Sequence, residues 1–162
     1  MNRAITILSD LQGRELLVDT NLLLLGVVGN FDYRLIGRKR LEAFTVQDLN
    51  LLNLLVSRAK RLITTPGILT ETSNLATQLI DGKRQIELFH KFGIKIKEFD
   101  ERHESSAVVC EEPAFLSLGL TDAAITRIAR DGMLVLTVDF PLYGYLNKNG
   151  VEALNFNHLR TA

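Results

Sequence analysis

Four acidic residues stand where a chain of alternating strands and helices would bring carboxylates together. Asp19 ends the first buried apolar run, and Asp139 ends a later run of the same kind. Glu71 follows an intervening apolar run at the start of a predicted helix, and Asp122 opens the helix that follows a glycine. In open parallel sheets, ligands bind in the crevice beyond the carboxyl ends of the strands. The spacing therefore predicts that these four side chains meet at one edge of a sheet.

Carboxylates gathered in this way favour a particular chemistry. Like charges at short range raise each other's pKa, so a cluster of four is strongly unfavourable without a cation. The motifs offer hard oxygen ligands, with neither cysteine nor histidine beside them, and such ligands favour Mg²⁺ or Mn²⁺ over Zn²⁺. These ions can activate a water and stabilise the attacking and leaving oxygens of a phosphodiester. The four acids are thus candidates for both metal ligation and catalysis.

Two polar residues are candidates for supporting the acids. Thr137 lies two residues before Asp139 on the same predicted strand, so both side chains project to one face. Asn21 lies two residues after Asp19, where its amide can orient that carboxylate or a bound water. We therefore expect Asn21 and Thr137 to hold the acidic groups in place.

The alternative for each acid is that it only caps a helix. Aspartate is common at helix starts because its oxygen accepts a hydrogen bond from a free backbone amide. For one residue alone we favour capping, whereas for the ordered set of four we favour a site. Glu71 is least explained by capping, since its neighbours Thr70 and Thr72 are better caps.

The elements that must position these acids alternate along the chain. Apolar runs predict strands, and helical spacing with capping residues predicts the helices between them. Strands are predicted at 15–18, 62–65, 133–138 and 151–156, and helices from about 22 and at about 45–61, 70–80, 84–92, 113–119, 122–131 and 142–148. The segment 94–106 fits a half-exposed strand and a helix nearly equally. This alternation implies an α/β fold with a parallel sheet covered on both faces.

Length and composition fit a single domain with a full-sized core. The chain has 162 residues, a mass of 18.2 kDa and 46% hydrophobic residues, and no stretch reads as a linker. We therefore interpret 1–162 as one domain. The 19 basic and 19 acidic residues give no formal net charge, which argues against a protein that coats nucleic acid by bulk charge alone.

Basic residues nevertheless gather at two places in the sequence. One cluster holds Arg34, Arg38, Lys39 and Arg40, and the other holds Arg58, Lys60 and Arg61. For either cluster alone, the favoured interpretation is a solvated helix face.

The sequence also bears on the cellular compartment. A single cysteine, Cys110, excludes an internal disulfide and a thiolate metal site, and we predict that it is a small buried apolar residue. The longest apolar run, 22–28, is far shorter than the roughly 20 residues that span a bilayer. Asp10 and Glu15 stand where a signal peptide needs apolar residues. We therefore expect a cytoplasmic protein that does not associate with membranes.

Taken together, four segments resemble the motifs of the PIN-domain family, in the family's order. They are LVDTN at 17–21, TPGILTE at 65–71, GLTDAA at 119–124 and LTVD at 136–139, and the match spans 16–156. The resemblance implies a three-layer α/β/α sandwich around a central parallel sheet, and an endoribonuclease that depends on Mg²⁺ or Mn²⁺. Motif by motif, it implies an acidic metal site of Asp19, Glu71, Asp122 and Asp139, supported by Thr137 and Asn21.

The resemblance also implies partners. Small PIN proteins similar to VapC are often toxins of toxin–antitoxin pairs and commonly form dimers, so an antitoxin and a homodimer are candidates beside the RNA substrate. The region 26–45 is long and basic for such a toxin, and Arg38, Lys39 and Arg40 within it are candidates for RNA binding. The apolar helix at 44–56 fits a dimer contact and core packing equally well.

Two other classes of function remain open. The first is a catalytically silent PIN-like module that binds RNA or a partner protein while the acids serve structure. The second is a receiver-like or phosphatase-like domain on a similar sheet. That class needs paired acids at its start, or an aspartate two residues after the nucleophilic one. Asn21 occupies that place here, so this class ranks last.

Overall fold

The chain folds into alternating strands and helices in a computed structural model that describes residues 3–129 and 132–160. The strands are β1 (Glu15–Val18), β2 (Arg61–Thr64), β3 (Asp100–Glu101), β4 (Leu134–Thr137) and β5 (Ala153–Asn155). The longer helices are α1 (Arg3–Leu11), α2 (Thr20–Phe31), α3 (Val46–Arg58), α4 (Pro66–Ala76), α5 (Gly82–Ile96), α8 (Leu120–Ile128) and α9 (Phe140–Lys148). The short ones are η1 (Tyr33–Leu35), η2 (Lys39–Leu41), α6 (Ser106–Val109), α7 (Pro113–Leu118) and α10 (Asn157–Arg160).

The five strands form one parallel sheet with the order β3-β2-β1-β4-β5. At its centre, Leu17 of β1 pairs with Ile63 of β2 and Val135 of β4. At one edge, Thr137 of β4 pairs with Asn155 of β5. The predicted α/β fold with a parallel sheet is therefore confirmed. Because the strands run in one direction, the carboxyl ends of β1 and β4 lie side by side.

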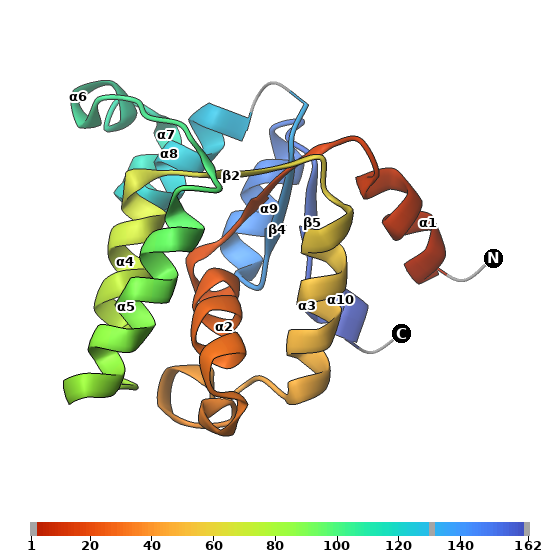
Figure 1. Ribbon diagram of the computed structural model, residues 1–162. Coiled ribbons are helices and arrows are strands. Elements are labelled where there is room, and N and C mark those ends of the chain that lie inside the picture. The colour runs from red at the N-terminus through yellow and green to blue at the C-terminus, as the bar shows by residue number, and fades with distance from the viewer. Residues whose placement is uncertain (1–2, 130–131, 161–162) are drawn as a thin grey trace.

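Two helical layers cover the sheet. On β1, Leu16 and Val18 face one way and Leu17 faces the other, and all three are buried. The first face packs against α2 and α3, and the second packs against α4, α8 and α9. Figure 1 shows α1 and α3 on one side of the strands and α4 and α8 on the other. The predicted three-layer sandwich is therefore present.

Several helix boundaries differ from the predicted ones. The helix predicted at 70–80 begins at Pro66, because the Thr65 hydroxyl accepts a hydrogen bond from the Ile68 amide and caps the helix there. In the ambiguous segment, α5 continues to Ile96, and only the two residues of β3 are extended. Helix α1 has no counterpart among the predicted elements. None of these differences moves the ends of β1 and β4 by more than a residue.

Helix α3 begins at the predicted capping box and buries its apolar face. The Thr45 hydroxyl accepts from the Asp48 amide, and the Asp48 carboxylate accepts from the Thr45 amide. Leu49, Leu52 and Leu55 are buried in the core. Core packing therefore accounts for these three leucines, whereas Val46 and Leu54 of the same helix are exposed. A dimer contact through this helix stays a prediction.

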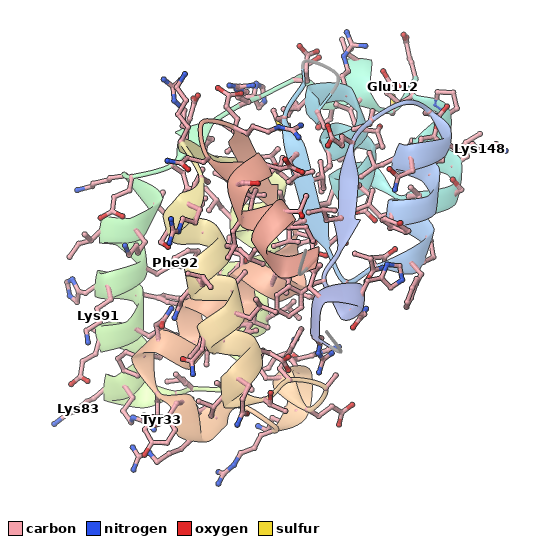
Figure 2. The ribbon with its side chains drawn as sticks, turned by 90° about the vertical axis from the view of Figure 1, so that its right-hand side faces the viewer. Tyr33, Lys83, Lys91, Phe92, Glu112 and Lys148 are labelled. Atoms are coloured by element: carbon pink, nitrogen blue, oxygen red, sulfur yellow. The ribbon has the colours of Figure 1, made fainter. Side chains whose placement is uncertain are left out.

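The surface carries mixed charge and one exposed thiol. Of the helices that the structure describes, none is both long and apolar enough to cross a membrane. Lysines project from opposite sides of the molecule, as Lys83 of α5 and Lys148 of α9 show in Figure 2. The prediction that Cys110 is buried is wrong, because this residue ends the four-residue helix α6, which buries only Val109.

Candidate acidic site at the carboxyl edge of the sheet

Asp19 lies just after β1 and is fixed by three hydrogen bonds. Its Oδ1 accepts from the Leu22 amide at 2.9 Å, which caps α2. Its Oδ2 accepts from the Val138 amide at 2.9 Å and from the Thr137 hydroxyl. Burial raises the pKa of Asp19, the three hydrogen bonds oppose that rise, and the charge of Asp139 adds to it. Asp19 is therefore a helix cap and also a close neighbour of a second acid.

Thr137 joins Asp19 to Asp139. Its hydroxyl donates to Asp19 and accepts from the backbone amide of Asp139 at 2.9 Å. The Asp139 carboxylate accepts from the Leu142 amide at 2.7 Å and so caps α9. Thr137 itself is completely buried. The structure thus places this threonine between the two acids, where the sequence predicts a supporting residue.

Glu71 reaches the same edge from the second turn of α4. Its Oε2 accepts from the Thr20 hydroxyl at 3.1 Å, and its Oε1 accepts from the Thr121 hydroxyl at 2.6 Å. Thr20 directly follows Asp19 and Thr121 directly precedes Asp122, so Glu71 bridges the starts of α2 and α8. Neither Thr20 nor Thr121 belongs to the predicted site, although each lies within one of the four motifs. The sequence signal for each residue is its place in a motif, next to a predicted acid.

Asp122 is subject to the charges of the three other acids. It lies in the first turn of α8 and is partly buried. Desolvation raises the pKa of Asp122 to about 7, and the charges of Asp139, Asp19 and Glu71 contribute to the rise. Charges have this effect only when they are close in space. The four predicted acids are therefore close enough to interact: Asp19 and Asp139 follow β1 and β4, Glu71 lies in the second turn of α4, and Asp122 lies in the first turn of α8.

The backbone just before Asp122 requires glycine. Gly119 has φ 84° and ψ 177°, a conformation that residues with side chains rarely adopt. A Cβ at this position would meet no atom within 4 Å, so the requirement comes from the backbone alone. This residue separates α7 from α8 and sets the direction in which α8 presents Asp122.

The acidic residues suit a divalent cation in their charge and ligand type. All four offer carboxylate oxygens, which Mg²⁺ and Mn²⁺ prefer, and a cation would relieve the repulsion that raises the pKa of Asp122. Within the described part of the chain, no three Asp, Glu, His or Cys side chains form a ready-made coordination group. The oxygens of Asp19 and Glu71 accept hydrogen bonds instead. A cation would therefore bind after these side chains turn, or through the waters that Mg²⁺ usually retains.

Asn21 does not hold Asp19 in the way that the sequence suggests. Among the described residues, the hydrogen bonds to the Asp19 carboxylate come from Thr137 and two backbone amides. Asn21 is exposed and lines a neighbouring polar depression. A contact between Asn21 and a bound water stays a prediction.

This depression, which we call the basic depression, adjoins the acids through Asn21 and Val138. It has a volume of about 690 Å³ and is also lined by Lys39, Arg40, Glu42, Ala43, Phe44, Gln78, Asn157 and Arg160. Gln78 accepts hydrogen bonds from two cations of this depression. Lys39 Nζ donates to its backbone oxygen at 2.9 Å, and Arg40 Nε donates to its side-chain oxygen at 2.8 Å. Lys39 and Arg40 thus line the same depression as Val138, the residue before Asp139, whereas the exposed Arg38 does not line it.

Two residues that the sequence does not single out complete the basic depression. Arg160 donates to both carboxylate oxygens of Asp48 at 2.9 Å, and to Asn157 at 3.1 Å. The Asn157 amide donates to the Val138 carbonyl at 3.1 Å. These contacts fix α10 against the chain immediately before Asp139. They join segments that are remote in sequence and belong to no motif.

Other clustered cations are paired away from the acids. Arg34 lies 2.8 Å from Asp32. Arg61 lies 3.1 Å from Asp100 and 3.9 Å from Glu15. Because Arg61 begins β2, it stands at the opposite edge of the sheet from the acids. For these residues the simpler interpretation, a solvated surface with ion pairs, is sufficient.

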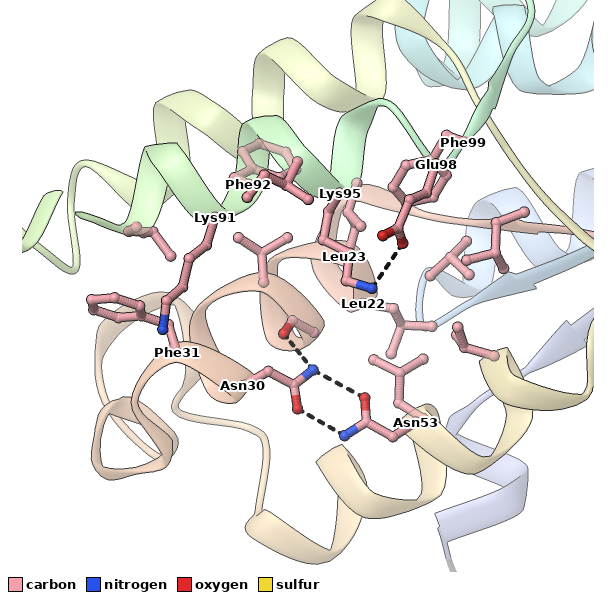
Figure 3. Close-up of a pocket in the computed structure, with 18 residues that line it drawn as sticks. Leu22, Leu23, Asn30, Phe31, Asn53, Lys91, Phe92, Lys95, Glu98 and Phe99 are labelled. Atoms are coloured by element: carbon pink, nitrogen blue, oxygen red, sulfur yellow. Dashed lines mark hydrogen bonds and ion pairs between the residues drawn. The ribbon is translucent and has the colours of Figure 1, made fainter. Parts of the chain in front are cut away.

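An apolar pocket lies apart from the four acids, between α2, α3 and α5 (Figure 3). It has a volume of about 430 Å³, and leucine, valine and phenylalanine side chains such as Leu22 and Phe92 form most of its wall. On one wall, Asn30 and Asn53 exchange hydrogen bonds of 3.0 and 2.8 Å. Because its wall is mostly apolar, this pocket is suited to an apolar ligand or protein segment.

Comparisons with known proteins show no family for this chain. No family model matches the chain, and no curated protein matches it. Among solved structures, the chain is similar to a domain of a functionally unknown protein from Methanocaldococcus jannaschii DSM 2661. The two share 19% identity with a TM-score of 0.47, over 88% of this chain and 91% of that chain. The resemblance to PIN domains therefore rests on the four sequence motifs.

Proposed function

We propose that the protein is a Mg²⁺- or Mn²⁺-dependent endoribonuclease that hydrolyses phosphodiester bonds. The observation that carries this proposal is the meeting of four carboxylates at the carboxyl edge of the sheet. Hydrogen bonds through Thr137 link Asp19 to Asp139, and Glu71 binds the threonines beside Asp19 and Asp122. Helix capping explains Asp19 and Asp139 individually, but it does not explain Glu71. The order of the four PIN-like motifs supports the same function.

Each residue of the site would have a different role in hydrolysis. Asp19 is held by three donors, so its carboxyl group has a fixed position in the site. Asp122, with its raised pKa, is the carboxylate best placed to exchange a proton near neutral pH. When bound, a divalent ion supplies an activated water and charge neutralisation at the phosphate. Glu71 stays anchored by Thr20 and Thr121 and fixes α4 relative to α2 and α8.

RNA would approach over the basic depression. Lys39 and Arg40 offer positive charge beside the acids, where the phosphates that flank the cleaved bond must lie. Arg38, which is exposed on the same segment, would contact RNA further away. A chain with no net charge needs such local placement of cations, because its overall charge does not attract RNA.

We extend the proposal to a cytoplasmic toxin of a toxin–antitoxin pair. An antitoxin would need a surface for its apolar side chains, and the pocket in Figure 3 provides one, with Lys91 and Lys95 among its lining residues. A homodimer also stays in the proposal, although the buried face of α3 does not contribute to it. Co-expression with the product of a neighbouring small gene, followed by co-purification, tests the antitoxin.

A catalytically silent RNA- or protein-binding module is the second candidate. It is favoured by one observation, the lack of a ready-made coordination group among the described residues. On this alternative the acids serve as caps and hydrogen-bond acceptors. RNA binding in the absence of cleavage, with every metal tried, would support it.

The test is incubation of a mixed pool of single-stranded RNA with the purified protein in Mg²⁺, Mn²⁺ or EDTA. Asp122→Asn is the matched variant, because it removes one negative charge with little change in size. We expect cleavage that needs metal and falls at least about 100-fold in the variant. Equal cleavage by the variant, or cleavage in EDTA, contradicts the proposal.

A further inference from the structure

An exposed aromatic side chain stands directly beside the acidic site. Phe140 follows Asp139 and begins α9, yet it is 57% exposed. A single exposed apolar side chain is ordinary on a protein surface. Phe140 differs in its position, because the preceding residue belongs to the acidic site and the following residues form the rigid first turn of a helix.

Two further rings pack around Phe140 to form a surface that we call the aromatic shelf, made of Phe140, Tyr143 and His158. The ring of His158 lies 6.0 Å from that of Phe140, centre to centre, with an angle of 57° between the planes. It lies 5.6 Å from the ring of Tyr143, edge to face. His158 is exposed on α10, beside Asn157, which is bound to the Val138 carbonyl. The shelf is therefore fixed to the same backbone that carries Asp139.

The shelf, the acidic site and the basic depression meet along one short segment of the chain. Val138 lines the basic depression, Asp139 belongs to the acidic site, and Phe140 begins the shelf, so consecutive residues contribute to the three surfaces. The basic depression offers cations for phosphates, and the shelf offers ring faces. A nucleic-acid strand presents both groups, whereas an apolar protein surface matches the rings alone.

We propose that the aromatic shelf stacks an unpaired base of the RNA next to the cleaved phosphodiester, with Phe140 as the main contact. This inference rests on the proposed ribonuclease function and names its substrate class, which is single-stranded RNA. A base within a duplex is already stacked and paired, so its face is not accessible to the shelf. Any base can stack on an aromatic ring. The shelf therefore selects for unpaired RNA more strongly than for a particular sequence.

The protein contains no tryptophan, which allows a direct optical test. Phe140→Trp would be the only indole in the protein, and stacking of a base on an indole quenches its fluorescence. The titration uses an unstructured single-stranded RNA oligonucleotide in EDTA, which prevents metal-dependent cleavage. Ile86→Trp is the control, because Ile86 is 61% exposed on α5, which contributes to neither the shelf nor the acidic site.

We expect saturable quenching of Phe140→Trp by the single-stranded oligonucleotide, and much weaker quenching by the same sequence in a duplex. Ile86→Trp should show no quenching. In a binding assay, Phe140→Leu should weaken affinity for the oligonucleotide about 10-fold, because it removes the stacking ring and keeps an apolar side chain, and Phe140→Tyr should restore it. Circular dichroism confirms that each variant is folded.

The possible failures are distinguishable. Quenching without metal-dependent cleavage would support the shelf and overturn the ribonuclease proposal. Metal-dependent cleavage with unquenched Phe140→Trp, and unchanged affinity in Phe140→Leu, would overturn the shelf alone. A third outcome is that the emission maximum of Phe140→Trp shifts on dilution and does not change when RNA is added. The shelf would then be a contact between copies of the chain, and this result also overturns the inference.

Discussion

The carboxyl groups of Asp19 and Asp122 are both shielded from solvent, but their surroundings differ. Asp19 is only 5% exposed, but three hydrogen-bond donors stabilise its ionised form against burial. Asp122 lies among three other acids, and its pKa rises to about 7. The pKa of Asp19 is raised as well, but the rise at Asp122 includes the charges of three other acids, which makes Asp122 an informative residue to change.

The first prediction concerns the pH dependence of stability. The pKa of Asp122 in the folded protein exceeds the value of about 3.9 for an unperturbed aspartate, so the folded state binds more protons between about pH 4 and 7. Stability should fall as pH rises through that window, by about 1–2 kcal/mol after allowance for solvent screening. The fall should be smaller in Asp122→Asn, which retains the contribution of Asp19, whose pKa is also raised. Urea unfolding in EDTA at several pH values measures it, and identical pH profiles for both proteins would contradict it.

The second prediction concerns the buried hydroxyl of Thr137. Thr137→Val keeps the shape of the side chain but removes the donor to Asp19 and the acceptor for the Asp139 amide. We expect a loss of about 1–3 kcal/mol in the free energy of unfolding at neutral pH. Thr137→Ser retains the hydroxyl and should lose less. Equal stability of wild type and Thr137→Val in chemical denaturation would show that the hydroxyl does not stabilise Asp19.

At the scale of the elements, the site depends on how each helix starts. Asp19 and Asp139 cap α2 and α9, so the same hydrogen bonds that begin these helices also orient the carboxylates. Helix α8 differs, because no side chain caps it and Gly119 sets its start in a glycine conformation. The position of Asp122 therefore depends on one backbone turn.

A substitution at that turn provides the third prediction. Gly119→Ala forces a side-chain-bearing residue into φ 84°, which should cost about 1–3 kcal/mol in stability and displace Asp122. RNA cleavage should fall along with stability. Gly93→Ala is the matched control in the interior of α5, where a Cβ meets no atom within 4 Å, and it should stabilise by about 0.5–1 kcal/mol. The reverse order of stability in thermal unfolding would argue against a constraint at Gly119.

At the scale of the whole molecule, positive charge is arranged locally. The chain has 19 basic and 19 acidic residues, and lysines such as Lys83 and Lys148 project from opposite sides (Figure 2). The basic depression, which Lys39 and Arg40 line, brings positive charge beside the acids of the ordered motifs. The affinity for RNA should therefore depend on which cations are removed and not only on their number.

The fourth prediction follows from this arrangement. The double variant Lys39→Gln, Arg40→Gln should weaken RNA binding and reduce the salt dependence of the affinity, by about 0.7 in log–log slope for each RNA phosphate that is no longer neutralised. The double variant Arg58→Gln, Lys60→Gln removes the same charge near β2, at the far edge of the sheet, and should bind like wild type. Fluorescence anisotropy in EDTA measures both. Equal weakening by the two variants would mean that bulk charge governs binding.

The strands and the acids that follow them were predictable, because their signals are local. An apolar run that stops at an acid marks a strand end, as at Asp19 and Asp139, and parallel topology then brings these ends together. The contacts of Glu71 with Thr20 and Thr121 were not predictable, although all three residues lie within the motifs, because they join residues about 50 positions apart and no local pattern indicates which side chains pair. Cys110 was predicted wrongly, because a general preference for burial does not reveal a short exposed helix.

Arg160 shows the limit of local signals at the scale of the whole molecule. It ties α10 to Asp48 at the start of α3, across 112 positions of sequence, and so closes the basic depression. Nothing near Arg160 in the sequence indicates that contact. A contact of this kind can be recognised only when the arrangement of the strands and helices is known.

The four carboxylates are proposed to hold a metal-dependent hydrolytic site, and the rate of RNA cleavage tests this claim most directly. The measurement compares wild type, Asp122→Asn and Asp81→Asn on one single-stranded RNA in Mn²⁺ and in EDTA. Asp81 is an exposed acid at the start of α5, so its variant controls for the removal of one charge. We expect cleavage by wild type and Asp81→Asn only with metal, and at least about 100-fold less by Asp122→Asn. Cleavage at the wild-type rate by Asp122→Asn would contradict the claim.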